Sequence, residues 1–176
     1  MIDFRQYITF SEKYLQLAKA ENQKNLDTDW LLIPALTFAW SAMELFVNNM
    51  LDDFSSLPED MFQMHERAFL LEKRLRFNNT GTDCGNFTLE NTEYRSLEDK
   101  ILFLIAKAGK GKKIRESTFW SDFIAFKKKR DSFIHPSRNK EEHLTLTIKE
   151  VELFISTSKQ VIQLVSSEVW KKEIEF

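Results

Sequence analysis

The stretch Trp30–Phe54, WLLIPALTFAWSAMELFVNNMLDDF, decides the fold class of this chain. Pro34 falls near its start, where a missing amide hydrogen costs a helix little. Apolar residues recur every three or four positions along the segment, namely Leu32, Leu36, Ala39, Met43, Phe46 and Met50. This spacing places them on one face of an α-helix, so the sequence predicts a long core helix.

The rest of the chain continues the helical pattern. Ser96-x-x-Asp99 and Thr147-x-x-Glu150 are typical of helix starts, because each side chain can bond the exposed amides of a first turn. Residues 78–95 hold two glycines and many Thr and Asn residues, so we expect a loop insertion there and no strand hairpin. The sequence predicts one all-α domain over residues 1–176, a bundle of five to six helices at about 3–20, 30–54, 58–77, 96–109, 117–134 and 147–170.

Composition limits the classes of function. The chain is 43% hydrophobic and 30% charged, as in a folded soluble domain, and its net charge of -2 confines nucleic-acid affinity to local clusters. One cysteine, Cys84, and three scattered histidines predict neither an internal disulfide nor a metal site, and we expect no cofactor. The chain begins with a charged amphipathic stretch, and no apolar run approaches the length of a membrane span. The expected location is therefore cytoplasmic, with no membrane partner.

The segment 127–136, KKKRDSFIHP, combines the side chains best suited to phosphate chemistry. Arginine binds phosphate with a charged fork of donors, and histidine exchanges protons near neutral pH. Arg130 interrupts an aromatic helical stripe made by Phe119, Phe123, Phe126 and Phe133. Two interpretations stay open: a structural salt bridge with His135 as a helix-ending cation, or a cleft in which His135, released from the helix by Pro136, turns towards Arg130.

Arg130-Asp131-x-x-x-His135 resembles the Arg-x4-6-His signature of the HEPN superfamily, in which a polar residue commonly follows the arginine. Further segments are similar to that family in the same order along the chain: 39–48 to its early core helix, 96–101 to the helix before the motif, and 135–136 with 147–151 to the passage into the last helix. The resemblance spans most of residues 30–165.

The resemblance implies a HEPN-like bundle that forms a homodimer, with two Arg130/His135 pairs facing one cleft. Many such proteins are metal-independent ribonucleases of toxin–antitoxin, antiviral-defence or RNA-processing systems. Others bind RNA or nucleotides without cutting. We therefore expect an endoribonuclease with RNA as its partner, and an antitoxin or another protein as a further one. The alternative is a non-catalytic module that binds RNA, a nucleotide or a protein.

The expected reaction is attack of the RNA 2′-hydroxyl on the neighbouring phosphate, which leaves a 2′,3′-cyclic phosphate. His135 would remove or return a proton, and Arg130 would stabilise the charge that develops on the phosphate. Asp131 either orients a partner side chain or is an exposed surface acid.

Glu44 and Asn48 belong to a narrow polar strip on the helix predicted at 30–54. The strip is either a solvated edge or part of the cleft, with Glu44 balancing the charge of Arg130 or of a lysine. The basic residues near the motif are likewise either a solvated face or a surface that holds the RNA backbone. They include Lys110, Lys112, Lys113, Lys127, Lys128 and Lys129.

Overall fold

The computed structural model describes residues 3–24, 26–108, 114–134 and 145–176. In this part of the chain there are six α-helices, a 3-10 turn at Glu59–Met61 and a two-stranded antiparallel sheet. The helices are α1 (Phe4–Asn22), α2 (Asp29–Ser55), α3 (Met64–Leu70), α4 (Leu97–Lys107), α6 (Thr118–Ile134) and α7 (Ile148–Val169), and the strands are β1 (Lys73–Phe77) and β2 (Phe87–Thr92). The prediction of an all-α helical bundle is confirmed.

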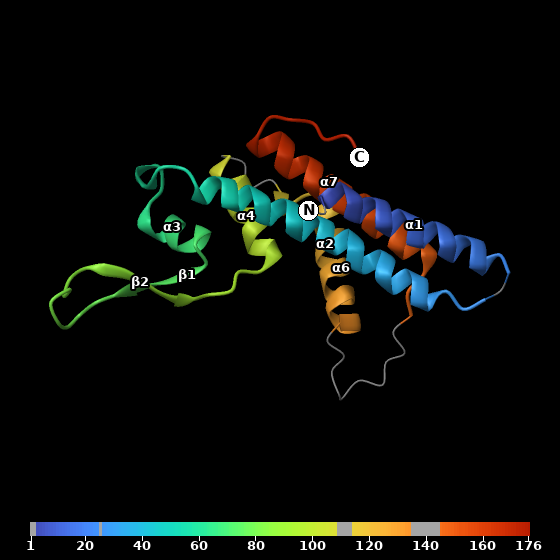
Figure 1. Cartoon of the computed structure of the whole chain (residues 1–176), viewed down its shortest axis with the longest axis horizontal. Helices are drawn as coiled ribbons and strands as arrows, with labels where there is room; N and C mark the ends of the chain where they lie inside the picture. Colours follow the sequence, from blue (N-terminus) through green and yellow to red (C-terminus); the bar gives the residue numbers. More distant parts are fainter. Residues whose placement is uncertain (1–2, 25, 109–113, 135–144) are drawn as a thin grey trace.

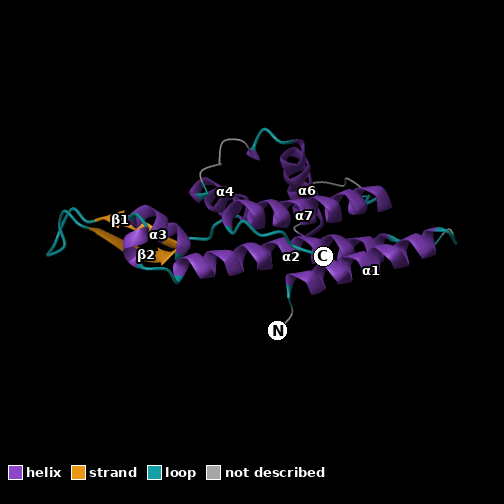
Figure 2. Ribbon diagram, turned by 90° about the horizontal axis from the view of Figure 1, so that it is seen from above, coloured by secondary structure: helices purple, strands orange, loops and turns teal. Residues whose placement is uncertain are grey.

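Helix α2 is the centre of the bundle. Figures 1 and 2 show α1 beside α2 in one layer, with α4, α6 and α7 forming a second layer against it. All six members of the predicted stripe are buried, and other buried α2 residues widen the contact to both layers. The long apolar segment therefore positions every other helix.

Local sequence signals start two helices where they were expected. The hydroxyl of Ser96 accepts the Asp99 amide at 3.2 Å, and that of Thr147 accepts the Glu150 amide at 3.3 Å. In return, the Glu150 carboxylate accepts the amide of Thr147 at 2.8 Å and completes a capping box. These contacts satisfy amides that a helix leaves open in its first turn.

The prediction for residues 58–95 was wrong in two respects. Residues expected to continue one helix form α3 and then strand β1, and the expected loop contains strand β2. The strands pair from Phe77 opposite Phe87, next to the connecting loop, to Lys73 opposite Thr92. The loop turns at Gly81 and Gly85, whose φ values are 83° and 88°. Cys84 is exposed on this loop. The hairpin projects from the α3 end of the bundle (Figure 1).

The expectation that no apolar run approaches membrane-spanning length was also wrong. By length and composition, α2 is able to cross a membrane. More than half of its most apolar window is buried inside the structure, as in the core helix of a soluble protein. Its burial by α1 and by the second layer accounts for the apolar sequence without a bilayer.

Candidate functional site

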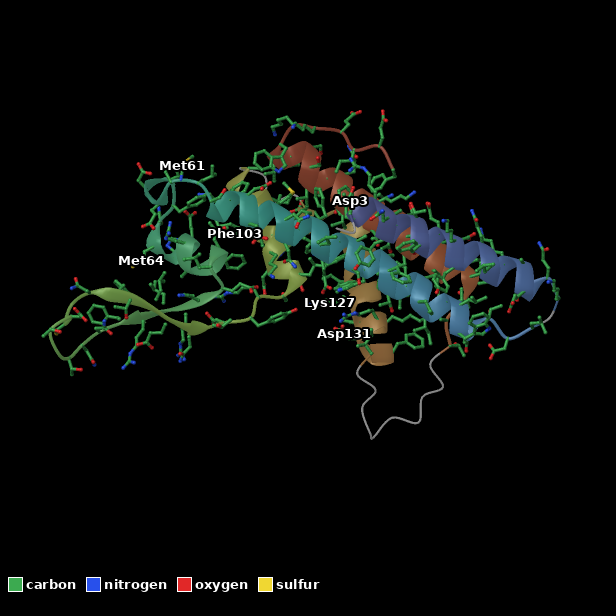
Figure 3. The ribbon with its side chains drawn as sticks, in the orientation of Figure 1. Asp3, Met61, Met64, Phe103, Lys127 and Asp131 are labelled. Atoms are coloured by element: carbon green, nitrogen blue, oxygen red, sulfur yellow. The ribbon has the colours of Figure 1, made fainter. Side chains whose placement is uncertain are left out.

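Arg130 lies near the C-terminal end of α6, where this helix passes α2. Figure 3 shows its neighbours Lys127 and Asp131 on the last turns of α6. Phe123 and Phe126 on the same helix are buried, and the Arg130 side chain is 21% exposed. The aromatic stripe therefore carries Arg130 into a mostly covered position, as its spacing predicted.

Two residues in the described part of the chain contact the Arg130 guanidinium. Its Nη1 donates to Asp131 Oδ1 at 2.9 Å, and its Cζ lies over the ring of Trp40, 5.2 Å from the ring centroid. Trp40 belongs to α2 and is buried. Arg130 is thus in an ion pair, but with its immediate neighbour in the chain and not with an acid from another helix.

Two hydrogen-bond donors at this place are buried without an acceptor. Arg130 Nε and Trp40 Nε1 both lack a hydrogen-bond partner among the described residues. A buried donor without an acceptor costs about 1–3 kcal/mol, so most buried donors in proteins are paired. The junction of α2 and α6 therefore holds two donors for which the described residues supply no acceptor.

His135 lies outside the described residues, as do Lys110, Lys112 and Lys113. The described part of α6 runs to Ile134, the residue before His135, and the expected end of the helix at His135 falls outside the described residues. The distance between Arg130 and His135 is accordingly not part of the described geometry.

The basic run on α6 divides into paired and unpaired residues. Lys127 Nζ donates to Glu98 of α4 at 2.9 Å, and Lys129 donates to Glu150 of α7. Lys128 is exposed, and within the described part of the chain its side chain makes no ion pair. Lys127 and Lys129 therefore tie α6 to its neighbours, whereas Lys128 faces solvent.

The lysine bridge and the helix cap together lower the pKa of Glu150. Its burial acts to raise the pKa above the ordinary value of 4.5, but hydrogen bonds from Lys129 and from both the hydroxyl and the amide of Thr147 favour the charged carboxylate more strongly. The net pKa is lowered. One carboxylate thus holds the start of α7 and the end of α6 at the same place.

The polar strip of α2 is not one site. Glu44 lies one helical turn after Trp40, and the ion pairs described for Arg130, Lys127 and Lys129 are made with other acids. Asn48 instead accepts a hydrogen bond from Lys100 Nζ of α4 at 3.0 Å.

Lys100 also lies 2.7 Å from Glu72 Oε1, close enough for an ion pair but not aligned as a hydrogen bond. Asn48, Glu72 and Lys100 line a cavity of about 440 Å³ together with Leu51, Asp52, Ser55, Leu70 and Leu71. Tyr94 packs on the outside, with Lys100 Nζ 5.8 Å from its ring centroid. Asn48 therefore belongs to the junction of α2, α4 and the hairpin, away from Arg130.

Sequence reasoning did not single out Trp40 at the first of these sites, or Glu72, Tyr94 and Lys100 at the second. Trp40 stood inside the segment that resembles the family's early core helix, but a tryptophan in an apolar stripe is more often only a core residue. Among the described residues, no group of three or more His, Cys, Asp and Glu side chains is placed to hold a metal ion. No family model matches the chain, and no curated protein or solved structure is significantly similar to it.

Proposed function

We propose that this chain is a metal-independent endoribonuclease of the HEPN type, with Arg130 and His135 as its catalytic residues. The observation that carries the proposal is the state of Arg130: a mostly buried guanidinium with its Nε unpaired, five residues before a histidine. A charge in that position is costly unless an anion compensates it, and the partner in the described residues is Asp131, whose side chain is half-exposed and leaves other donors of Arg130 for a second anion. An RNA phosphate is such an anion, and the family resemblance names it.

In the proposed reaction the RNA 2′-oxygen attacks the adjacent phosphorus while the bond from phosphorus to the 5′-oxygen breaks. The proton of the 2′-hydroxyl leaves to a base, and the 5′-oxygen gains a proton as it departs. His135 serves one of these transfers, and in a symmetric dimer the second His135 serves the other. Arg130 binds the non-bridging oxygens, on which negative charge increases in the transition state. The products are a 2′,3′-cyclic phosphate and a 5′-hydroxyl.

Asp131 orients Arg130 in this scheme. Its carboxylate already holds Nη1 at 2.9 Å, which leaves Nη2 as the terminal nitrogen to donate to the phosphate. A carboxylate this close to the scissile group repels phosphate, so it is unsuited to enter the substrate site itself. Lys128, exposed on the same helix, adds attraction for the RNA backbone.

The test is cleavage of a 5′-labelled single-stranded RNA in excess EDTA. We expect fragments that end in 2′,3′-cyclic phosphate, no cleavage of the matching DNA, which lacks the 2′-hydroxyl, and loss of cleavage in Arg130→Ala and His135→Ala. Lys128→Ala is the comparison: it removes a positive charge from the same helix, and it should raise KM through weaker RNA binding while leaving kcat nearly unchanged. Circular dichroism checks that each variant is folded.

Two outcomes would overturn the proposal. Cleavage that requires a divalent ion, or that survives His135→Ala, would remove the proton-transfer role of the histidine. Binding of RNA without any cleavage would instead favour the non-catalytic module, which uses the same arginine only as a ligand for phosphate.

A further inference from the structure

We infer that Trp40 is a positioning residue for Arg130 in the proposed cleavage, because its indole ring holds the guanidinium where the phosphate must bind. The inference rests on the proposed function, since Trp40 acts only through Arg130. It concerns a residue of α2 that carries no acid–base chemistry.

The Trp40 ring is a fixed platform. Trp40 is 3% exposed, and its ring stacks with Phe123 of α6 at 5.7 Å between centroids and 5° between planes. Phe154 of α7 stacks with it at 6.3 Å and 15°. Three helices therefore fix the plane of the indole, and rotation of the ring would open a void between them.

Arg130 needs such a platform because its ion pair does not locate it in the bundle. Asp131 is the next residue on the same helix, and adjacent residues on a helix do not face each other across it. The Asp131 contact lies within α6, so it does not fix Arg130 relative to the other helices. Among the described interactions, Trp40 is the residue from another helix that contacts the Arg130 guanidinium, so it alone fixes the group relative to α2.

An aromatic platform also leaves hydrogen-bond donors of the guanidinium available to a phosphate. A carboxylate from another helix would occupy further donors of Arg130 and compensate its positive charge. An indole ring attracts the cation through its π-face without occupying the donor fork. Arg130 Nε is accordingly buried and unpaired. The arrangement holds the guanidinium in place and leaves donors other than the Nη1 bound to Asp131 for a phosphate, which is what stabilisation of its transition state requires.

The experiment compares Trp40→Leu and Trp40→Phe with a matched control, Trp120→Leu. Trp120 is similarly buried, at 5% exposed, and its ring lies 5.0 Å from the same Phe123, but no cation from the described residues lies over it. Cleavage of RNA in EDTA gives kcat and KM for each folded variant. We expect Trp40→Leu to lower kcat about tenfold with KM within about twofold, and Trp40→Phe to keep most of kcat because a ring remains. Trp120→Leu should leave kcat within about twofold.

A double-mutant cycle separates positioning from general destabilisation. In an Arg130→Lys background, which lacks the planar fork, Trp40→Leu should cost less than about twofold further. An independent readout is the NMR signal of the Arg130 Nε–H, identified by its disappearance in Arg130→Lys. Ring currents make this signal sensitive to Trp40, so it should shift in Trp40→Leu and stay in place in Trp120→Leu.

The inference is overturned if the Trp40→Leu and Trp120→Leu variants lose the same activity, if the losses in the cycle are additive, or if the Nε–H signal does not respond to Trp40→Leu. If Trp40→Leu does not fold, Trp40→Phe is tested with the same NMR signal. The signal must then shift, but by less than complete loss of the ring current would cause. If the proposed function itself is wrong, the result is different. The unmodified protein then cuts no RNA, and Trp40 has no positioning role in cleavage.

Discussion

At the scale of single residues, the surroundings of a charge decide what it can do. Lys127, Lys128 and Lys129 are consecutive in the sequence, yet two are bound to acids on other helices and one is exposed. The sequence alone could not separate them, because Glu98 and Glu150 are brought to α6 only by the fold. A uniform basic run in the sequence thus becomes one exposed cation and two links between helices.

The three lysines should therefore respond differently to substitution. Lys128→Ala should weaken RNA binding, reduce the slope of log affinity against log salt by about 1 and leave the melting temperature nearly unchanged. Lys127→Ala should chiefly lower the melting temperature, since it breaks the link between α6 and α4. Fluorescence anisotropy over a salt series and thermal melting measure the two effects. Equal effects on binding from both variants would contradict this division.

At the scale of elements, the beginnings of helices were readable from the sequence and the hairpin was not. Capping is local: Ser96 and Thr147 find their partners three residues away. The hairpin depends on strands separated by the loop 78–86, and β1 offers only two apolar residues in its alternating pattern. Similarly, Asn48 and Lys100 are 52 positions apart, so their hydrogen bond exists only in the folded chain.

The capping boxes make stability dependent on acid. For Glu66 of α3, the hydrogen bond from the Gln63 amide has the largest effect and lowers the pKa of the carboxyl. Together with Lys107 it outweighs burial, which acts to raise that pKa. The pKa of Glu150 is lowered as well. A carboxylate whose pKa is lower in the folded state adds stability above its ordinary pKa of 4.5 and loses it as the pH falls through the folded value. We expect the free energy of unfolding to decrease as the pH is lowered below about 4.5. Urea denaturation at pH 3 to 7 measures it.

Glu150→Gln and Glu66→Gln should each flatten that pH profile, while Glu173→Gln, in the exposed C-terminal segment, serves as the control for loss of one carboxylate. An unchanged slope in Glu150→Gln would mean that the cap of α7 does not contribute to the acid response.

The hairpin should be removable as a unit. The amide of Glu93 donates to the carbonyl of Glu72 at 2.7 Å, so the two ends of residues 73–92 already lie together. Replacing that segment with Gly-Gly should keep the helical circular dichroism and RNA cleavage, because the hairpin projects away from α6 (Figure 1). Loss of cleavage in a folded variant would show that the hairpin takes part in substrate binding.

At the scale of the whole molecule, the proposed reaction calls for two chains, since one histidine cannot serve both proton transfers at once. We expect light scattering to give twice the mass of a single chain and a symmetric dimer that brings the ends of both α6 helices together. Mixing unmodified chains with an excess of His135→Ala chains should lower cleavage more than dilution does, because each mixed dimer retains one histidine and the scheme uses two. A monomer at high concentration that still cuts RNA would contradict the shared cleft.

The exposed thiol on the hairpin loop gives access to that assembly. Cys84 is the single cysteine of the chain and stands on an arm that points away from the bundle. A spin label or dye attached there would report from one known position per chain, without mutagenesis and at a distance from Arg130. In a symmetric dimer the two labels would yield one separation, and changes in that separation on adding RNA would follow the movement of one subunit against the other.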